Sequence, residues 1–302
     1  MNITISNILS RLDNNHDESI ISLLTHERNK MISFSSSAYY LKVKDSNKLK
    51  LLNGLLPSLK NCFWPNMDYY AMLASKKGNQ SIQKKGDTSN GGFGQYYGKI
   101  RGSIVHTQLH DYLFYNNYFF EKKHKQLHPW SKRILEEIIK KGWIPIISEF
   151  NVFDSKTNIG TSIDMVCYCR SKSKIILIEI KTGYKNVFES KRGTMSGCLK
   201  KIMPLSFEYC ATLQLVVPML FIMKNHCIDL SNLEGHVIQI NDNEFNFYKI
   251  SESFILENGK NIYDSLVKSY TSSIIKKRKQ KKDKRTLNQI KKTPKKISKK
   301  KK

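Results

Sequence analysis

Residues 160–184, GTSIDMVCYCRSKSKIILIEIKTGY, contain two apolar, β-like runs that are separated by the polar turn RSKSK. Each run carries an acidic residue in apolar surroundings: Asp164 lies in the first, and Glu179 lies in the second, two residues before Lys181. An ionised group that is buried without a partner loses its hydration at a large free-energy cost. We therefore expect the two carboxylates and the lysine to lie together.

The spacing of these three residues suits a metal site. Residues two apart on a strand share a face, so Glu179 and Lys181 project together, and pairing of the strands can bring Asp164 beside them. Two carboxylates suit Mg²⁺ or Mn²⁺, which takes further ligands from water and substrate phosphate. The ion lowers the pKa of bound water, which Lys181 can orient or help to deprotonate. The alternative interpretations are a buried ion pair and three solvated strand residues.

The composition indicates a globular protein with a polyanionic partner. The chain has 302 residues, 40% of them hydrophobic, enough for one large domain or one domain with extensions. Its formal net charge is +26, which favours binding to nucleic acid. Residues 276–302 contain 16 Lys/Arg and one Asp, and their net charge of +15 leaves +11 for residues 1–275. The body of the protein is therefore basic as well as its tail.

The cysteines and the N-terminus predict a reduced, intracellular environment. The six cysteines form no C-x-x-C pattern, so a zinc or iron–sulfur site has weak support. Cys167 and Cys169 would share a strand face, and we interpret them as buried, reduced residues. The first 15 residues lack the features of a signal peptide, and no apolar run approaches the roughly 18 residues of a membrane span. We expect no membrane partner.

Composition and periodicity divide the chain into three parts. Residues 1–97 mix short amphipathic segments with a loop rich in Gly, Lys and Ser, and we expect a mostly helical N-terminal lobe. Residues 98–275 alternate predicted helices and strands, which is typical of an α/β core with a central mixed sheet flanked by helices. Residues 276–302 form a low-complexity basic tail that we expect to be disordered.

About residues 100–220 resemble the PD-(D/E)xK nuclease superfamily, and within it the RecB-type and lambda-exonuclease-like branches. GSIVH, ending at His106, is similar to the G-[ST]-x-x-H helix motif, and SEF places Glu149 on a strand where the family often has an acid. GTSID resembles the motif that ends in the metal-binding aspartate, and IEIKTG resembles the strand motif with the catalytic lysine. LQLVVP resembles the start of the Q-L-x-x-Y helix motif, with Gln214 as its glutamine and Pro218 in place of its tyrosine.

The resemblance implies a restriction-endonuclease-like core and assigns roles within it. It implies that Asp164, Glu179 and Lys181 are catalytic, and that His106 joins the two carboxylates as a metal ligand. Glu149 would bind a second metal or bond Lys181, and Gln214 would contact the substrate backbone from the cleft. A helix-face histidine, a strand-edge acid and a core amide are the structural alternatives for His106, Glu149 and Gln214. We expect His110 to be structural.

These observations predict a Mg²⁺- or Mn²⁺-dependent deoxyribonuclease, an exonuclease of recombination, repair or genome processing. The alternatives are a noncatalytic nucleic-acid-binding or packaging protein on a nuclease-like core and, among enzymes, a structure-specific endonuclease. The tail would bind DNA phosphates without sequence preference through its basic residues, beginning with Lys276, Lys277, Arg278 and Lys279. A nuclear targeting signal at residues 276–285 is equally compatible with this run. A mitochondrial location or a viral origin stays open.

Overall fold

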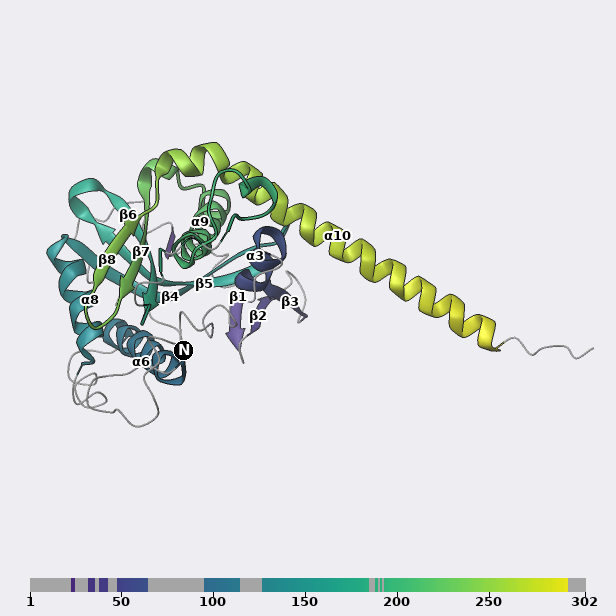
Figure 1. Cartoon of the computed structure of the whole chain (residues 1–302), viewed down its shortest axis with the longest axis horizontal. Coiled ribbons are helices and arrows are strands. Elements are labelled where there is room, and N and C mark those ends of the chain that lie inside the picture. Colours follow the sequence, from purple (N-terminus) through teal and green to yellow (C-terminus); the bar gives the residue numbers. More distant parts are fainter. Residues whose placement is uncertain are drawn as a thin grey trace, which may run out of the picture.

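The computed structural model of the chain describes residues 23–24, 32–35, 38–42, 48–64, 95–114, 127–184, 188–189, 191 and 193–292. Within these ranges the chain forms a mixed sheet with helices on both faces, which confirms the predicted α/β class (Figure 1). The strands are β1 (Ile32–Ser35), β2 (Ala38–Lys42), β3 (Leu49–Gly54), β4 (Trp143–Asp154), β5 (Ile159–Cys169), β6 (Lys174–Thr182), β7 (Leu233–Ile240) and β8 (Phe245–Lys249). The helices are α3 (Leu55–Phe63), α6 (Gln95–Phe114), α8 (Pro129–Lys140), α9 (Phe207–His226) and α10 (Glu252–Lys292).

The sheet divides into two branches at β5. Strand β4 pairs with β5 along one side, over the whole length of β5. On the other side, β3 pairs in parallel with residues 159–160, whereas β6 pairs antiparallel from Met165 onward. One branch continues as β3–β2–β1 and the other as β6–β7–β8. Residues 161–164 of β5 therefore lie between the branches and pair with neither, and Asp164 is the last of them.

The two faces of the sheet carry separate hydrophobic cores, which explains the apolar run of β6. Its even-numbered apolar residues pack with α6 and α8, whereas Ile175 and Leu177 pack with α9. Side chains alternate between the faces of a strand. Glu179 and Lys181 continue the odd-numbered series, so the strand itself directs them to the α9 side. Cys167 and Cys169 lie on one face of β5, as predicted, since both side chains are in the core with α6 and α8.

Helix α9 is the central helix of its face. The hydroxyl of Ser206 caps its N-terminus by accepting from the Tyr209 N–H, and the helix continues through Pro218 to His226. By length and composition alone it could cross a membrane, but most of its apolar window is buried inside the protein. Its hydrophobicity is therefore that of a helix packed between the sheet and α10.

The N-terminal part differs from the prediction. The described portion of residues 1–97 contains strands β1–β3 as well as α3 and the first turn of α6, so the expectation of a mostly helical lobe is corrected there. The run KLKLLNG suits either an amphipathic helix or a strand, and pairing with β2 and β5 decides for the strand. Most of the predicted loop from residue 76 lies outside the described residues, which resume at Gln95.

The C-terminal part also differs from the prediction. We expected disorder from Lys276, whereas α10 continues to Lys292 and extends away from the body (Figure 1). The first half of α10 buries Ile255, Ile262 and Leu266 against the body, so the helix is nucleated by packing. Lys, Arg and Gln are good helix formers, and adding them to an existing helix costs little. Residues 293–302 of the predicted tail lie outside the described residues.

Candidate metal centre

Three side chains from three different elements meet at the branch point of the sheet. His106 comes from α6, Glu149 from β4 and Asp164 from β5, and one ligand atom of each lies within 4.8 Å of the others. The Nδ1 atom of His106 is 3.5 Å from Oε1 of Glu149 and 3.6 Å from Oδ1 of Asp164. One imidazole nitrogen and two carboxylate oxygens are ligand atoms that together can bind a divalent cation.

The register of β4 and β5 brings the two carboxylates together. Ser148 lies opposite Met165 and Phe150 lies opposite Ile163, which places Glu149 opposite Asp164. A β-bulge at Pro145/Ile147 shifts the register just before this point. Glu149 itself has φ of 52°, in the left-handed region that a residue with a side chain rarely adopts. Local backbone strain of this kind is concentrated at functional sites.

Asp164 occupies the gap that opens between β5 and β6. The ladder between these strands ends at the Met165–Ile178 pair, and beyond it Oδ2 of Asp164 accepts a hydrogen bond of 2.6 Å from the Ile180 N–H. Burial and the nearby Glu179 carboxylate raise the pKa of Asp164 well above its usual range. A carboxyl group in this position gains from a positive partner, which His106 or a cation supplies.

Glycine at position 102 lets α6 approach the sheet closely enough for His106 to reach the carboxylates. A β-carbon at Gly102 would lie 2.8 Å from Oγ1 of Thr182, at the end of β6. His106 follows one helical turn later on the same face. The adjacent Asp164 charge raises the pKa of His106 to about 9, so the imidazole carries a proton at neutral pH when no cation competes with it.

Glu179 and Lys181 form an ion pair beside the cluster. Nζ of Lys181 donates to Oε1 of Glu179 at 2.5 Å and to Oε1 of Gln214, on α9, at 3.1 Å. Gln214 in turn donates to the carbonyl of Cys210 at 3.1 Å, which fixes the orientation of its amide. Burial alone would lower the pKa of Lys181, but Glu179, Tyr184 and Asp164 together outweigh it and raise the pKa. The lysine therefore stays charged.

The sequence predicts His106, Asp164 and Glu179 as the metal ligands, and the structure brings a different set of three residues together. Among the described residues, Glu149 completes the cluster with His106 and Asp164, while Glu179 pairs with Lys181. Glu179 still adds negative charge that raises the pKa of both His106 and Asp164. His110, expected to be structural, makes a hydrogen bond of 2.8 Å with Ser148.

Two further residues were not identified from the sequence: Ser162, which contacts the cluster, and Tyr39, which reaches it through Ser162. Ser162 donates to Oε2 of Glu149 at 3.0 Å, and the hydroxyl of Tyr39 lies 3.1 Å from Oγ of Ser162. Ser162 is two residues before Asp164 on β5, so the period of the strand could have indicated it. No local pattern could have indicated Tyr39, which reaches the site from β2 across 123 residues of sequence.

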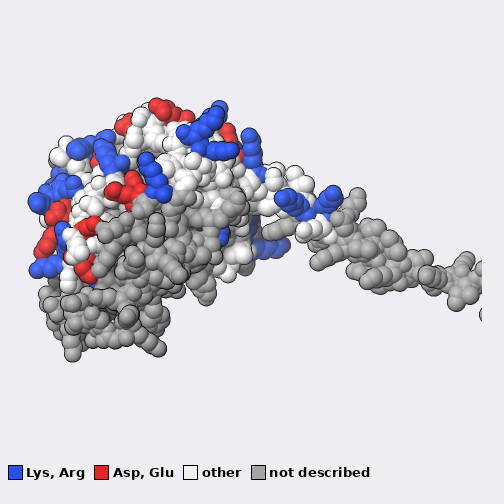
Figure 2. Space-filling model, in the orientation of Figure 1, with Lys and Arg blue, Asp and Glu red and all other residues white. Residues whose placement is uncertain are grey.

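Basic side chains, with acidic ones among them, lie on the visible face of the body and on α10 where it leaves the body (Figure 2). Figure 2 shows Lys and Arg side chains on the upper and left parts of the visible face and where α10 leaves the body. Lys276 and Lys279 are exposed on this helix, and Lys277 and Arg278 belong to the same turn. The predicted DNA-binding residues of the tail thus lie on a helical extension.

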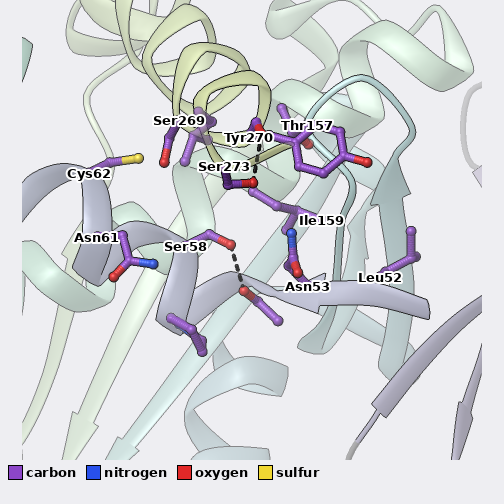
Figure 3. Close-up of a pocket in the computed structure, with 13 residues that line it drawn as sticks. Leu52, Asn53, Ser58, Asn61, Cys62, Thr157, Ile159, Ser269, Tyr270 and Ser273 are labelled. Atoms are coloured by element: carbon purple, nitrogen blue, oxygen red, sulfur yellow. Dashed lines mark hydrogen bonds between the residues drawn. The ribbon is translucent and has the colours of Figure 1, made fainter. Parts of the chain in front are cut away.

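A cavity of about 440 Å³ lies elsewhere, between α3 and α10 (Figure 3). Its lining consists of neutral side chains, among them Ser58, Asn61, Thr157 and Tyr270. The Ser58 hydroxyl is already bonded to the Gly54 carbonyl. Neither the cluster nor Lys181 lines this cavity, and its described lining contains no charged group for acid–base or metal chemistry. The candidate functional site is therefore the branch point of the sheet.

Comparisons with known proteins find distant structural similarity. The structure of a candidate exonuclease from Eubacterium rectale is similar, with a TM-score of 0.35 and 15% sequence identity. The match covers 71% of this chain and 80% of the exonuclease chain. The structure of SSO0001 has a TM-score of 0.20 and 16% identity, covering 53% of this chain and 84% of its own. Similarity at this level carries no argument about function. No protein-family model and no curated protein matches the chain.

Proposed function

We propose that the protein is a divalent-metal-dependent nuclease that hydrolyses phosphodiester bonds in DNA. The observation that carries this proposal is the convergence of His106, Glu149 and Asp164 beside the Glu179–Lys181 pair. Three carboxylates repel a phosphate unless a cation lies between them, whereas a Lys/Arg surface alone is enough to bind nucleic acid. This arrangement therefore favours catalysis over the noncatalytic binding or packaging function.

The proposed mechanism divides the work between two groups of residues. His106, Glu149 and Asp164 would hold Mg²⁺ or Mn²⁺, which acts as a Lewis acid toward the phosphate and makes its coordinated water more acidic. Lys181 stays protonated because the neighbouring groups, Glu179 first among them, together outweigh its burial. Two of its three N–H groups are bonded to Glu179 and Gln214, so the third would donate a hydrogen bond to the attacking water, and the charge of the ammonium would offset that of the phosphate. Gln214 would keep the ammonium of Lys181 directed into the site.

The substrate would be bound mainly through its phosphates. The net charge of +26 supports DNA binding by the basic body and by α10, with the strong salt dependence that counterion release produces. We propose exonucleolytic cleavage inside the cell, in recombination, repair or genome processing. A structure-specific endonuclease would use the same chemistry and would differ in its requirement for DNA ends.

The test is degradation of labelled linear, circular and end-blocked duplex DNA with Mg²⁺, Mn²⁺ or chelator. We expect metal-dependent loss of linear DNA, with circular and end-blocked substrates resistant. Asp164→Ala and, separately, Glu179→Ala should abolish cleavage and leave DNA affinity within about threefold, because the basic surface is unchanged. Near-wild-type turnover in either variant would refute the site, and DNA binding without cleavage by the wild type would favour the noncatalytic function.

A further inference from the structure

A chain of hydroxyl groups connects the N-terminal branch of the sheet to Glu149. The Ser162 hydroxyl has a single proton, and it donates this proton to Oε2 of Glu149 at 3.0 Å. Ser162 must then act as the acceptor in its 3.1 Å contact with Tyr39, so the phenol donates. The other oxygen of Glu149, Oε1, faces His106. The hydroxyls thus hold one carboxylate oxygen and leave the other directed into the cluster.

Tyr39 is held in place by close packing on β5. A β-carbon at Gly160 would lie 2.7 Å from Cβ and 3.0 Å from Cγ of Tyr39, so only glycine leaves room for this side chain. The ring also packs against a small core of Leu41, Leu52 and Phe153. Burial raises the pKa of Tyr39, so the phenol keeps the proton that it donates. Gly160 of the GTSID stretch is therefore explained by Tyr39.

Glu149 has one restraint from His106, and the hydroxyls supply a second on its other oxygen. Its side chain is 42% exposed, and its backbone is in a left-handed conformation. An exposed glutamate samples several rotamers, and fixing one of them costs conformational entropy each time a ligand binds. The hydroxyls of Tyr39 and Ser162 would restrict the rotamers of Glu149 before the cation binds, because the ring of Tyr39 is itself held by packing.

We propose that Tyr39 and Ser162 are positioning residues that orient Glu149 as a ligand of the divalent cation. This inference rests on the metal site of the proposed function. The β1–β3 branch would then contribute to the metal centre, because Tyr39, on β2, supplies the first hydroxyl of the series that ends at Glu149. We call this series, Tyr39–Ser162–Glu149, the hydroxyl relay.

The test measures Mn²⁺ affinity of the full-length protein by calorimetry and electron paramagnetic resonance. Tyr39→Phe removes one oxygen and should weaken Mn²⁺ binding about 10-fold, with an unchanged melting temperature, as is typical for residues that support a ligand. Tyr40→Phe is the matched control, because Tyr40 is the next residue on β2 and has the opposite strand parity. Its Mn²⁺ affinity should equal that of the wild type.

Two further variants separate positioning from a general structural effect. Ser162→Ala should weaken Mn²⁺ binding about 10-fold or more, and Ser162→Thr should restore most of it by retaining the hydroxyl. In a Glu149→Gln background, Tyr39→Phe should have no additional effect, because the relay acts only through Glu149. Equal Mn²⁺ affinities for Tyr39→Phe and Tyr40→Phe would overturn the relay and leave the metal site standing. Failure of the wild type to bind Mn²⁺ would overturn both.

Discussion

Lys181 is the residue whose environment is most specific at the site. It is partly buried between a carboxylate and an amide, with Glu179 on its own strand and Gln214 on α9. A surface lysine that binds phosphate nonspecifically needs neither partner. The arrangement instead fixes the position of the ammonium and keeps it charged, as a residue that acts on the reacting phosphate requires.

Replacing Lys181 should therefore affect the chemical step more than binding. We expect Lys181→Ala to lower kcat by about 100-fold or more, with DNA affinity changed less than threefold, because the lost hydrogen bond and charge act on the reacting groups. Single-turnover cleavage and equilibrium binding measure the two quantities. Lys174→Ala, at the other end of β6, is the control and should leave both unchanged. Equal losses in binding and cleavage would mark Lys181 as a phosphate anchor.

At the scale of the elements, α10 is fixed to the body by a buried polar network. Asp154, at the end of β4, accepts from Lys224 of α9 at 2.6 Å and from the Tyr263 hydroxyl of α10 at 3.0 Å. The Thr157 N–H adds a further hydrogen bond of 2.7 Å. Asp154 thus joins the sheet, α9 and α10.

Removing the charge of Asp154 should destabilise the fold. Asp154→Asn leaves Lys224 without its carboxylate, at a cost of about 2 kcal/mol; this is less than for a fully buried pair because the Lys224 side chain is 36% exposed. Despite burial, the Lys224 hydrogen bond lowers the pKa of Asp154 below its usual value. The stabilisation is thus present above the unfolded-state pKa and is lost as the pH falls through the folded-state pKa.

Urea unfolding at several pH values checks this linkage. The free energy of unfolding should differ most between wild type and Asp154→Asn at neutral pH, and the difference should shrink below about pH 4. Asp229→Asn, at an exposed position, is the control and should stay within about 0.5 kcal/mol of the wild type. A difference that is constant from pH 7 to pH 3 would contradict a charged role for Asp154.

At the scale of the whole molecule, the candidate metal site and the most basic segment lie on different parts of the protein. The site is at the branch point of the sheet, whereas α10 carries its basic residues away from the body (Figure 1). From Lys276 to Lys292 the helix rises about 25 Å, at about 1.5 Å per residue. We propose that this helical extension contributes to affinity for DNA and leaves the geometry of the metal site unaffected.

Deleting residues 276–302 tests this separation. We expect weaker DNA binding and a flatter dependence of log K on log salt, since each neutralised phosphate contributes about −0.9 to that slope on duplex DNA. Cleavage at low salt should survive, because the deletion leaves Asp164, Glu179 and Lys181 in place. Binding titrations at several salt concentrations measure the slope. An unchanged slope would identify the basic body as the DNA-binding surface and favour a targeting role for the tail.

Local pattern determined a large part of this protein. The period of two places Glu179 and Lys181 on one face of β6, and continuous apolar runs identify β5 and β6. These features depend on residues close in sequence, where side-chain direction follows from backbone geometry alone. The α/β class and the order of its elements from α8 onward follow from the same reasoning.

Only the tertiary structure decided which residues share the candidate metal site. Glu149 faces Asp164 because a β-bulge shifts the register of β4 on β5, and a bulge is a feature of the paired strands that the alternation within either strand does not show. Tyr39 reaches the site because β3 joins β5 before β6 does, which opens the sheet at Asp164. Likewise, α10 extends into the basic tail because its first half is packed, a contact between distant segments that local composition does not contain.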